Sequence, residues 1–171
     1  MRVIAGQLRG RTIEVPAKGT RPTTDMVRGS IANSLVSLEA IDGARVADLY
    51  AGSGAMGIEL LSRGAAHCTF VERSPEAVRV IRANVTKLGL ADRAKVLAGD
   101  SITLARTVGK VDVLLADPPY GFGGWDELLA VVDARRAVLE GEGPVEPPPG
   151  WTLTKHKAHG RTHLSFLVRV P

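Results

Sequence analysis

The chain has 171 residues, 44% of them hydrophobic, and a formal net charge of +4 at pH 7. This length is typical of one domain, or of one domain with a small appendage. No apolar run approaches the roughly 20 residues that a membrane helix needs, and residues 1–6 lack the long apolar core of a signal peptide. A single cysteine, Cys68, excludes an internal disulfide. We therefore expect a cytoplasmic protein with Cys68 in the core rather than acting as a nucleophile.

Positive charge gathers at both ends of the chain. Residues 1–28 carry net +4, residues 150–171 carry net +4, and the residues between them carry net −4. Clustered positive charge attracts a polyanion through counterion release and steering. We therefore predict a nucleic-acid partner, with surface solubility as the alternative explanation. Aromatic residues make up only 4% of the chain, which argues against a large platform for stacking single-stranded bases.

The N-terminal part is expected to hold a hairpin and then a helix. Two short strands, at residues 2–5 and 11–15, would form a basic β-hairpin extension over residues 1–22. A helix then begins near Thr23, because threonine and aspartate are good capping residues. Its apolar stripe has helical spacing and consists of Val27, Ile31, Leu35 and Leu38.

From residue 45 onward, strand patterns alternate with helical patterns. Such alternation implies a parallel, doubly wound α/β sheet. We expect strands at 45–50, 67–72, 94–98, 111–116 and 136–140, and helices at 54–62, 75–88, 101–108 and 125–133. After a proline-rich break, residues 151–158 and 162–169 are expected to form an antiparallel hairpin. The prediction is a Rossmann-like, mostly parallel, seven-stranded sheet over residues 23–171.

A glycine loop follows the first of these strands, in the run from Asp48 to Gly57. Ligands of open α/β sheets bind beyond the carboxyl ends of the strands, and glycines let the backbone approach them closely. Glu72, which ends the second strand, suits ribose hydroxyls, and Asp48 suits a cationic cofactor that carries an amino acid. Asp100 suits an adenine amine, or it caps the helix that begins at Ser101. The candidate cofactor residues are Asp48, Tyr50, Gly52, Ser53, Gly54, Gly57, Glu72 and Asp100.

The spacing of Gly52, Gly54 and Gly57 also matches the dinucleotide-binding motif of dehydrogenases. Asp48 argues against that alternative, because a carboxylate there suits a pyrophosphate poorly. Nothing nearby resembles a site for hydride transfer. A plain turn without a ligand is a further alternative.

A second motif, Asp117-Pro118-Pro119-Tyr120, follows the strand at 111–116. Proline fixes its own φ and pushes the preceding residue out of the helical region, so this turn is rigid and extended. The carboxylate of Asp117 and the carbonyl of Pro118 would accept hydrogen bonds from an exocyclic amine, while Tyr120 would stack on the base. Such a base must be unpaired or flipped out. Together the two motifs indicate methyl transfer, with Asp117, Pro118, Pro119 and Tyr120 as candidate catalytic residues; a strand-ending turn is the alternative interpretation of this segment.

The sequence resembles the class I S-adenosylmethionine-dependent methyltransferases, and more narrowly the bacterial RsmD family, which methylates a guanine N2 in small-subunit (16S) ribosomal RNA. The marks of this resemblance are Arg9-Gly10-Arg11, Thr20-Arg21-Pro22-Thr23, Asp25, Arg28, the glycine loop, Ser62-Arg63-Gly64-Ala65, Phe70-Val71-Glu72, Asp117-Pro118-Pro119-Tyr120, and Gly160…Thr162 with Leu164-Ser165-Phe166.

By this resemblance, the glycine loop, Glu72 and Asp100 would hold S-adenosylmethionine, and Asp117 to Tyr120 would hold the guanine. The basic extension would grip RNA through Arg9, Arg11, Arg21, Thr23 and Arg28. The partner would be small-subunit RNA in the assembled or assembling 30S particle. We expect a monomer without a metal, since His156, His159 and His163 are irregularly spaced and no cysteine or acid joins them.

The chain departs from the family pattern in three places: residues 29–32, a shortened region at 125–147, and residues 159–162. Two alternatives therefore stay open beside guanine-N2 methylation. One is an amino methyltransferase with another acceptor, such as adenine N6 in DNA or RNA. The other is a non-catalytic RNA-binding assembly factor on the same fold.

Overall fold

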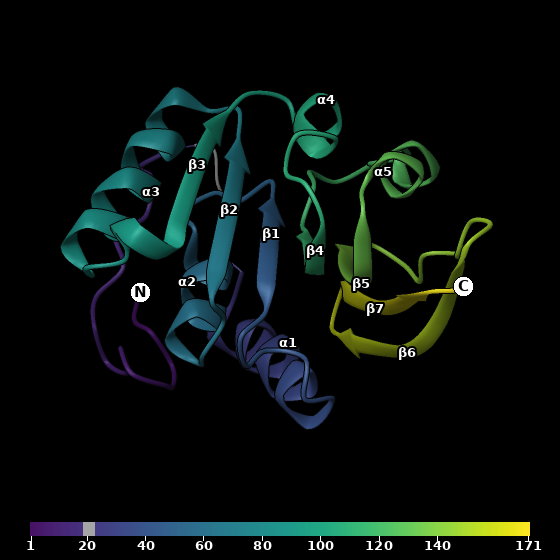
Figure 1. The fold of residues 1–171 in the computed structure, drawn as a ribbon, viewed down its shortest axis with the longest axis horizontal. Coiled ribbons are helices and arrows are strands. Elements are labelled where there is room, and N and C mark those ends of the chain that lie inside the picture. The colour runs from purple at the N-terminus through teal and green to yellow at the C-terminus, as the bar shows by residue number, and fades with distance from the viewer. Residues whose placement is uncertain (19–22) are drawn as a thin grey trace.

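The computed structural model describes residues 1–18 and 23–171, and its centre is a seven-stranded sheet in the order β3-β2-β1-β4-β5-β7-β6. Strands β1 to β5 pair in parallel, whereas β7 runs antiparallel to both β5 and β6. Figure 1 shows β3 at one edge of the sheet and β6 at the other. The strands are β1 (Arg45–Leu49), β2 (His67–Glu72), β3 (Ala94–Ala98), β4 (Val111–Ala116), β5 (Ala134–Gly141), β6 (Trp151–His159) and β7 (Thr162–Arg169). The predicted doubly wound sheet with a C-terminal antiparallel hairpin is confirmed.

Helices connect the parallel strands, and polar side chains cap three of them. The helices are α1 (Asp25–Ser37), α2 (Ala55–Ser62), α3 (Pro75–Lys87), α4 (Ser101–Ala105) and α5 (Trp125–Val131), with a short 3₁₀ turn η1 (Ala91–Arg93). The side chains of Thr24, Ser74 and Asp100 each accept a hydrogen bond from a backbone N–H in the first turn of α1, α3 and α4. Among the described helices, none combines the length and apolar character needed to cross a lipid bilayer.

Two hydrophobic cores sandwich the sheet, because successive side chains of a strand point to opposite faces. Val46 and Val113 belong to one core, whereas their neighbours Ala47 and Leu114 belong to the other. The first core includes apolar side chains of α1, α2 and α3, and the second includes those of α4 and α5. Cys68 is fully buried in the first core, so the prediction that it is a core residue is confirmed.

The N-terminal segment differs from the predicted hairpin. The expected strands at 2–5 and 11–15 reduce to a single antiparallel bridge between Arg2 and Thr12. The segment packs against the helices. Val3 and Ile13 are buried in the first core, the N–H of Ile4 donates to Glu59 of α2, and the N–H of Glu14 donates to Asn84 of α3. The two segments stay paired through three backbone hydrogen bonds, from Val3 to Arg11, Gly10 to Val3 and Ile13 to Met1, but the pairing is too short to form two regular strands.

Two element boundaries also differ from expectation. The helix expected at 101–108 ends at Ala105, after five residues. The fifth strand, expected at 136–140 and thought to be shortened, has eight residues from Ala134 to Gly141. It is extended because it lies between β4 and β7, and both neighbours supply backbone partners along its length.

Candidate active site

The candidate site lies where the order of strands reverses, between β1 and β4. Leu49 at the end of β1 pairs with Ala116 at the end of β4, so the glycine loop and Asp117 leave the sheet side by side. A cavity of about 570 Å³ opens there. Its wall includes seven of the predicted cofactor and catalytic residues, namely Asp48, Tyr50, Gly52, Ser53, Glu72, Asp117 and Pro119, and two of the predicted RNA contacts, Thr23 and Arg28. This position agrees with the general rule that ligands of open α/β sheets bind at such a reversal.

The backbone of the glycine loop is tied to Glu72. The N–H of Gly52 donates to one carboxylate oxygen of Glu72 at 2.9 Å, and the N–H of Ser74 donates to the other at 2.9 Å. Gly52 and Gly54 have φ of 57° and 79°, which glycine adopts without strain. Each carboxylate oxygen has a second lone pair, so Glu72 keeps acceptor capacity toward the cavity that it lines.

Gly57 serves packing rather than ligand approach. A Cβ at this helical position would lie 2.4 Å from Cε1 of Phe70 and 2.7 Å from Sγ of Cys68. The absence of a side chain lets α2 sit directly on the sheet, and the N–H of Gly57 donates to Oδ2 of Asp48 at 2.9 Å. Burial raises the pKa of Asp48 to about 8, against the opposing effect of that hydrogen bond.

Tyr50 and Asp100 take different positions relative to the cavity. Tyr50 has φ of 59°, lines the cavity, and its N–H donates to the hydroxyl of Ser101 at 3.1 Å. Asp100 caps α4 by accepting hydrogen bonds from the N–H and hydroxyl of Thr103, which lower its pKa. The capping role is thus confirmed, whereas contact with an adenine amine stays a prediction. Ser101, which sequence reasoning passed over, lines the cavity because it directly follows that cap.

Asp117 stands at the boundary between two cavities. It lines the first cavity and also a second one of about 390 Å³, on whose wall Tyr120 lies. The hydroxyl of Thr23 donates to Oδ2 of Asp117 at 3.1 Å, and Thr23 borders both cavities as well. Although the residue has exposed surface, crowding around its carboxyl removes water and raises the pKa of Asp117 to about 6, while the bond from Thr23 acts in the opposite direction.

The segment after the proline turn is held by a residue that directly follows β5. Gly121, which directly follows Tyr120, donates its N–H to the carboxylate of Glu142 at 2.7 Å. Tyr120 is 62% exposed, as a side chain that stacks on an incoming base must be. Phe122 packs edge-to-face against Tyr50 and Trp125, and neither Phe122 nor Trp125 lines the first cavity.

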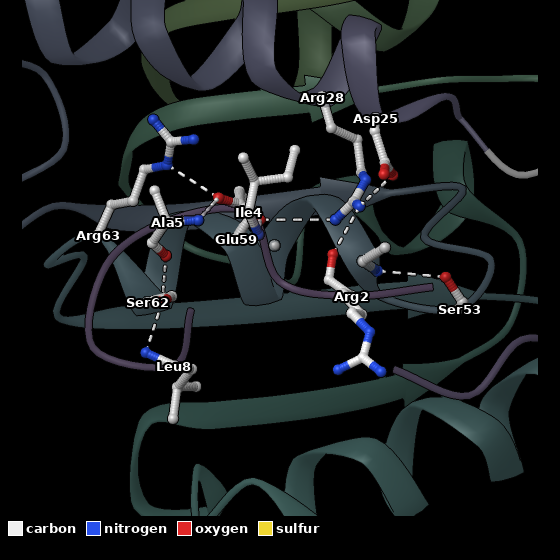
Figure 2. A network of polar contacts seen from close by, with 12 residues as sticks. Arg2, Ile4, Ala5, Leu8, Asp25, Arg28, Ser53, Glu59, Ser62 and Arg63 are labelled. Carbon is white, nitrogen blue, oxygen red and sulfur yellow. Dashed lines mark hydrogen bonds and ion pairs between the residues drawn. The ribbon is translucent and has the colours of Figure 1, made fainter. Parts of the chain in front are cut away.

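The predicted RNA contacts separate into three groups. Arg9 and Arg11 are exposed on the N-terminal segment, and Arg21 lies outside the described residues. Arg28 requires a correction: it has no exposed surface, because its guanidinium is enclosed by Asp25, Glu59 and the carbonyl of Arg2. Figure 2 shows this buried network, which joins α1, α2 and the N-terminal segment. A guanidinium in that position is not presented to a phosphate.

The C-terminal hairpin packs against α1 through polar contacts that the sequence did not reveal. Lys157 donates to the hydroxyls of Ser30 and Ser34 at 3.2 and 2.9 Å, and Nε2 of His159 lies 3.0 Å from the hydroxyl of Ser30. His156 and His163 form a stacked pair with ring centroids 5.1 Å apart. Within the described residues, no group of three or more His, Cys, Asp or Glu gathers as a metal site would.

Comparison with known proteins agrees with this architecture. The family described as conserved hypothetical protein 95 matches residues 1–168. Ribosomal RNA small subunit methyltransferase D of Escherichia coli (strain K12) is 34% identical over 181 residues, which cover 99% of this chain and 90% of that protein. The Bacillus subtilis protein YlbH is 38% identical over 148 residues, which cover 84% of this chain and 79% of that protein.

Solved structures extend the likeness to the whole fold. The Escherichia coli protein yhhF superposes with a TM-score of 0.85 at 31% identity and covers 99% of this chain and 97% of that chain. A hypothetical protein of Thermus thermophilus superposes with a TM-score of 0.82 at 31% identity and covers 99% of both chains. Motifs, fold and relatives therefore agree: the chain belongs to the conserved hypothetical protein 95 family, the RsmD family of methyltransferases.

Proposed function

We propose that this protein transfers a methyl group from S-adenosylmethionine to the exocyclic N2 amine of a guanine in small-subunit (16S) ribosomal RNA. The observation that carries the proposal is the position of Asp117 on the wall shared by two cavities. A donor in the first cavity and a flipped base in the second would meet at this carboxylate. The named relatives that act on small-subunit ribosomal RNA support the choice of acceptor.

The first cavity suits the cofactor by the chemistry of its lining. When bound, S-adenosylmethionine supplies an activated methyl group on a sulfonium centre. Glu72 retains acceptor capacity for the ribose hydroxyls, and Asp48, which lines the cavity, would face the cofactor's ammonium, whose positive charge favours the ionised carboxylate. The loop around Gly52 is fixed by its bond to Glu72, so the chain reaches a ligand with little reorganisation. Asp100 and Gly54 would complete this contact set.

In the second cavity, the chain's task is to orient a weak nucleophile. The lone pair of an exocyclic purine amine is delocalised into the ring, so positioning must supply most of the acceleration, which in favourable cases is about 7–11 kcal/mol. With its pKa near 6, Asp117 is mostly ionised at neutral pH and can accept one amine hydrogen. The carbonyl of Pro118 would accept the other, and the exposed ring of Tyr120 would cover the base.

Basic residues on the N-terminal segment and on the wall of the second cavity would hold the RNA. Arg9 and Arg11 are exposed on a segment that is bonded to α2 and α3, and Arg161 lines the second cavity. In this proposal residues 1–22 form the RNA-gripping extension and residues 23–171 the methyltransferase domain. The protein would act as a cytoplasmic monomer on the assembled or assembling 30S particle.

The direct test replaces Asp117 by alanine. With undermethylated small subunits and a labelled donor, we expect methyl transfer to fall at least about a hundredfold, because the amine loses its acceptor. The affinity for S-adenosylhomocysteine should stay within about threefold, since the donor contacts remain. Asp92→Ala, on the exposed turn η1, is the matched control and should leave both quantities unchanged. Activity of the Asp117 variant within a few-fold of the wild type would remove this residue from the mechanism.

A second experiment separates the acceptors. Free RNA, small-subunit particles and duplex DNA are compared as substrates, and the product nucleoside is identified by mass spectrometry. N2-methylguanosine from particles supports the proposal, whereas N6-methyladenine supports another amino methyltransferase. Binding to particles without any product supports a non-catalytic assembly factor.

A further inference from the structure

Glu140 and Asp117 lie side by side at the ends of neighbouring strands. Ala116 of β4 pairs with Leu139 of β5, and each acid directly follows one of these two residues. Ala116 and Leu139 are both buried in the second core, so the residues after them face the opposite side of the sheet, where α1 packs. Glu140 also pairs with Leu164 of β7, which belongs to the first core on that side. Both acids accordingly line the second cavity.

The second cavity therefore offers two carboxylates to whatever enters it, one from each strand. Among the described residues on its wall, the other charged side chain is Arg161, which lies exposed in the turn between β6 and β7. A cationic group on the same wall favours the ionised forms of the two acids. Glu140 is partly exposed and lines, in addition, a neighbouring cavity of about 350 Å³.

Guanine presents two donor groups next to each other on its Watson–Crick edge, the N2 amine and the N1–H. In the proposed function, Asp117 and the carbonyl of Pro118 accept the two hydrogens of the amine, which leaves the N1–H without an acceptor. We infer that Glu140 accepts the hydrogen bond from guanine N1–H and thereby selects guanine as the substrate base. This inference rests on the proposed function, because it names the residue that recognises the base which that function requires.

The same carboxylate rejects adenine. Adenine carries its exocyclic amine beside N1, which in this base is a hydrogen-bond acceptor. With the adenine amine held at Asp117, the lone pair of N1 would face an oxygen of Glu140, and neither atom has a proton to donate. A site built to hydrogen-bond one group rejects an analogue that lacks it, because the polar groups are left unpaired. Glu140 thus decides between two acceptors that the turn at Asp117 leaves open.

A substrate analogue separates recognition of N1 from the presence of the N2 amine. The base 2,6-diaminopurine keeps the N2 amine, but its N1 is an acceptor. Once mass spectrometry has located the methylated guanine, 16S RNA is ligated with either guanine or 2,6-diaminopurine at that position and assembled into small-subunit particles. We expect kcat/KM for methyl transfer by the wild type to be at least about tenfold higher with guanine. Equal transfer to both bases would overturn the inference, whereas transfer to neither would overturn the proposed function.

Two variants then assign the preference to Glu140. In Glu140→Gln the amide offers an acceptor to guanine N1–H and a donor to N1 of 2,6-diaminopurine, so the preference should fall to within about threefold. In Glu140→Ala transfer to guanine should fall at least about tenfold, while transfer to 2,6-diaminopurine changes less than about threefold. Glu146→Gln is the matched control: Glu146 lines the neighbouring cavity but not the second one, so its variant should keep the preference of the wild type.

A purely structural role for Glu140 gives a different pattern. Loss of support for the site would lower transfer to both bases by the same factor and would overturn the inference. Variants at Glu140 that keep the full preference for guanine would overturn it as well. Binding of S-adenosylhomocysteine verifies that each variant is folded, since Glu140 does not line the first cavity. Because Glu140 is partly exposed near the end of β5, neither substitution removes a side chain from the buried core.

Discussion

The hydroxyl of Thr23 donates a 3.1 Å hydrogen bond to the carboxylate of Asp117, across 94 positions of sequence. It links the residue just before the cap of α1 to the turn after β4, and both residues border the two cavities. The bond stabilises the ionised carboxylate and so lowers its pKa, which desolvation has raised to about 6. Thr23 is therefore placed to set the protonation state of the residue that would accept the substrate amine.

Removing this hydroxyl should shift the pH profile of methyl transfer. In Thr23→Val the pKa of Asp117 rises further, so a larger fraction is protonated and unable to accept the amine. We expect the acid limb of kcat/KM, located near the pKa of about 6, to move to higher pH. Activity should fall several-fold at the acid end and little at alkaline pH.

Thr23→Ser keeps the hydroxyl and serves as the control, with an unchanged profile. A Thr23→Val profile that is lowered equally at every pH would show that the hydroxyl acts on something other than the titration of Asp117.

Gly57 should tolerate no side chain. In Gly57→Ala the new Cβ would lie 2.4 Å from Phe70 and 2.7 Å from the sulfur of Cys68, both buried in the first core. Overpacking of this kind typically costs about 1–3 kcal/mol. We expect that loss in the free energy of unfolding, measured with denaturant.

Gly29→Ala provides a comparison of opposite sign. Gly29 lies inside α1, and its added Cβ would meet only Cδ1 of Ile4, at 3.9 Å. Replacing a helical glycine by alanine should stabilise the fold by about 0.5–1 kcal/mol. A Gly57→Ala protein as stable as the wild type would mean that α2 can move away from the sheet without penalty.

Asp48 should make stability depend on pH. Its pKa is about 8 in the folded chain against 3.8 for the ordinary side chain. A carboxyl with a raised folded pKa contributes stability that is fully present below the ordinary value and is lost as pH rises through the folded one. We expect the Tm of Asp48→Asn, measured without ligand, to improve relative to the wild type between about pH 4 and about pH 8. A Tm difference between Asp48→Asn and the wild type that stays constant over this range would contradict the prediction.

Two of the places where this chain departs from its family pattern touch each other. Ser30, in the stretch 29–32, lies 3.0 Å from the ring of His159, in the stretch 159–162. We expect Ser30→Ala and His159→Ala to be non-additive in unfolding free energy by about 0.5–1 kcal/mol, as contacting residues usually are. Ser37→Ala, in the last turn of the same helix, should instead add to His159→Ala without coupling, since Ser37 bonds to Asn33.

The sheet was predictable because its signals are periodic and local. Apolar runs alternating with capped helices specify parallel strands, and the register of β1 against β4 follows from burial on both faces. The hairpin expected at 2–5 and 11–15 forms only in part: one bridge and three backbone hydrogen bonds pair the two segments, while Val3 and Ile13 are buried against the helices. Local pattern does not reveal how far such pairing extends.

The candidate site was predictable where a motif dictates backbone geometry. The glycine loop and the turn at Asp117 fall at the ends of adjoining strands, so topology alone brings them together. Arg28 could not be placed in this way, because its burial depends on Glu59 and Asp25, and an arginine near a chain end is ordinarily assumed to face solvent. The contact between Ser30 and His159 joins residues 129 positions apart and leaves no trace in local periodicity.

The hydrogen bonds that hold the N-terminal segment to the helices determine which variants can test its role in RNA binding. Glu59 accepts hydrogen bonds from the backbone of Ile4 and Ala5, and Asn84 exchanges two with Glu14. Deleting this segment to ask whether Arg9 and Arg11 bind RNA would remove Val3 and Ile13 from the first core. It would also leave the buried carboxylate of Glu59 without the two N–H donors of Ile4 and Ala5. Charge reversal at those two arginines is therefore the cleaner way to probe RNA affinity, because it leaves the scaffold beneath them whole.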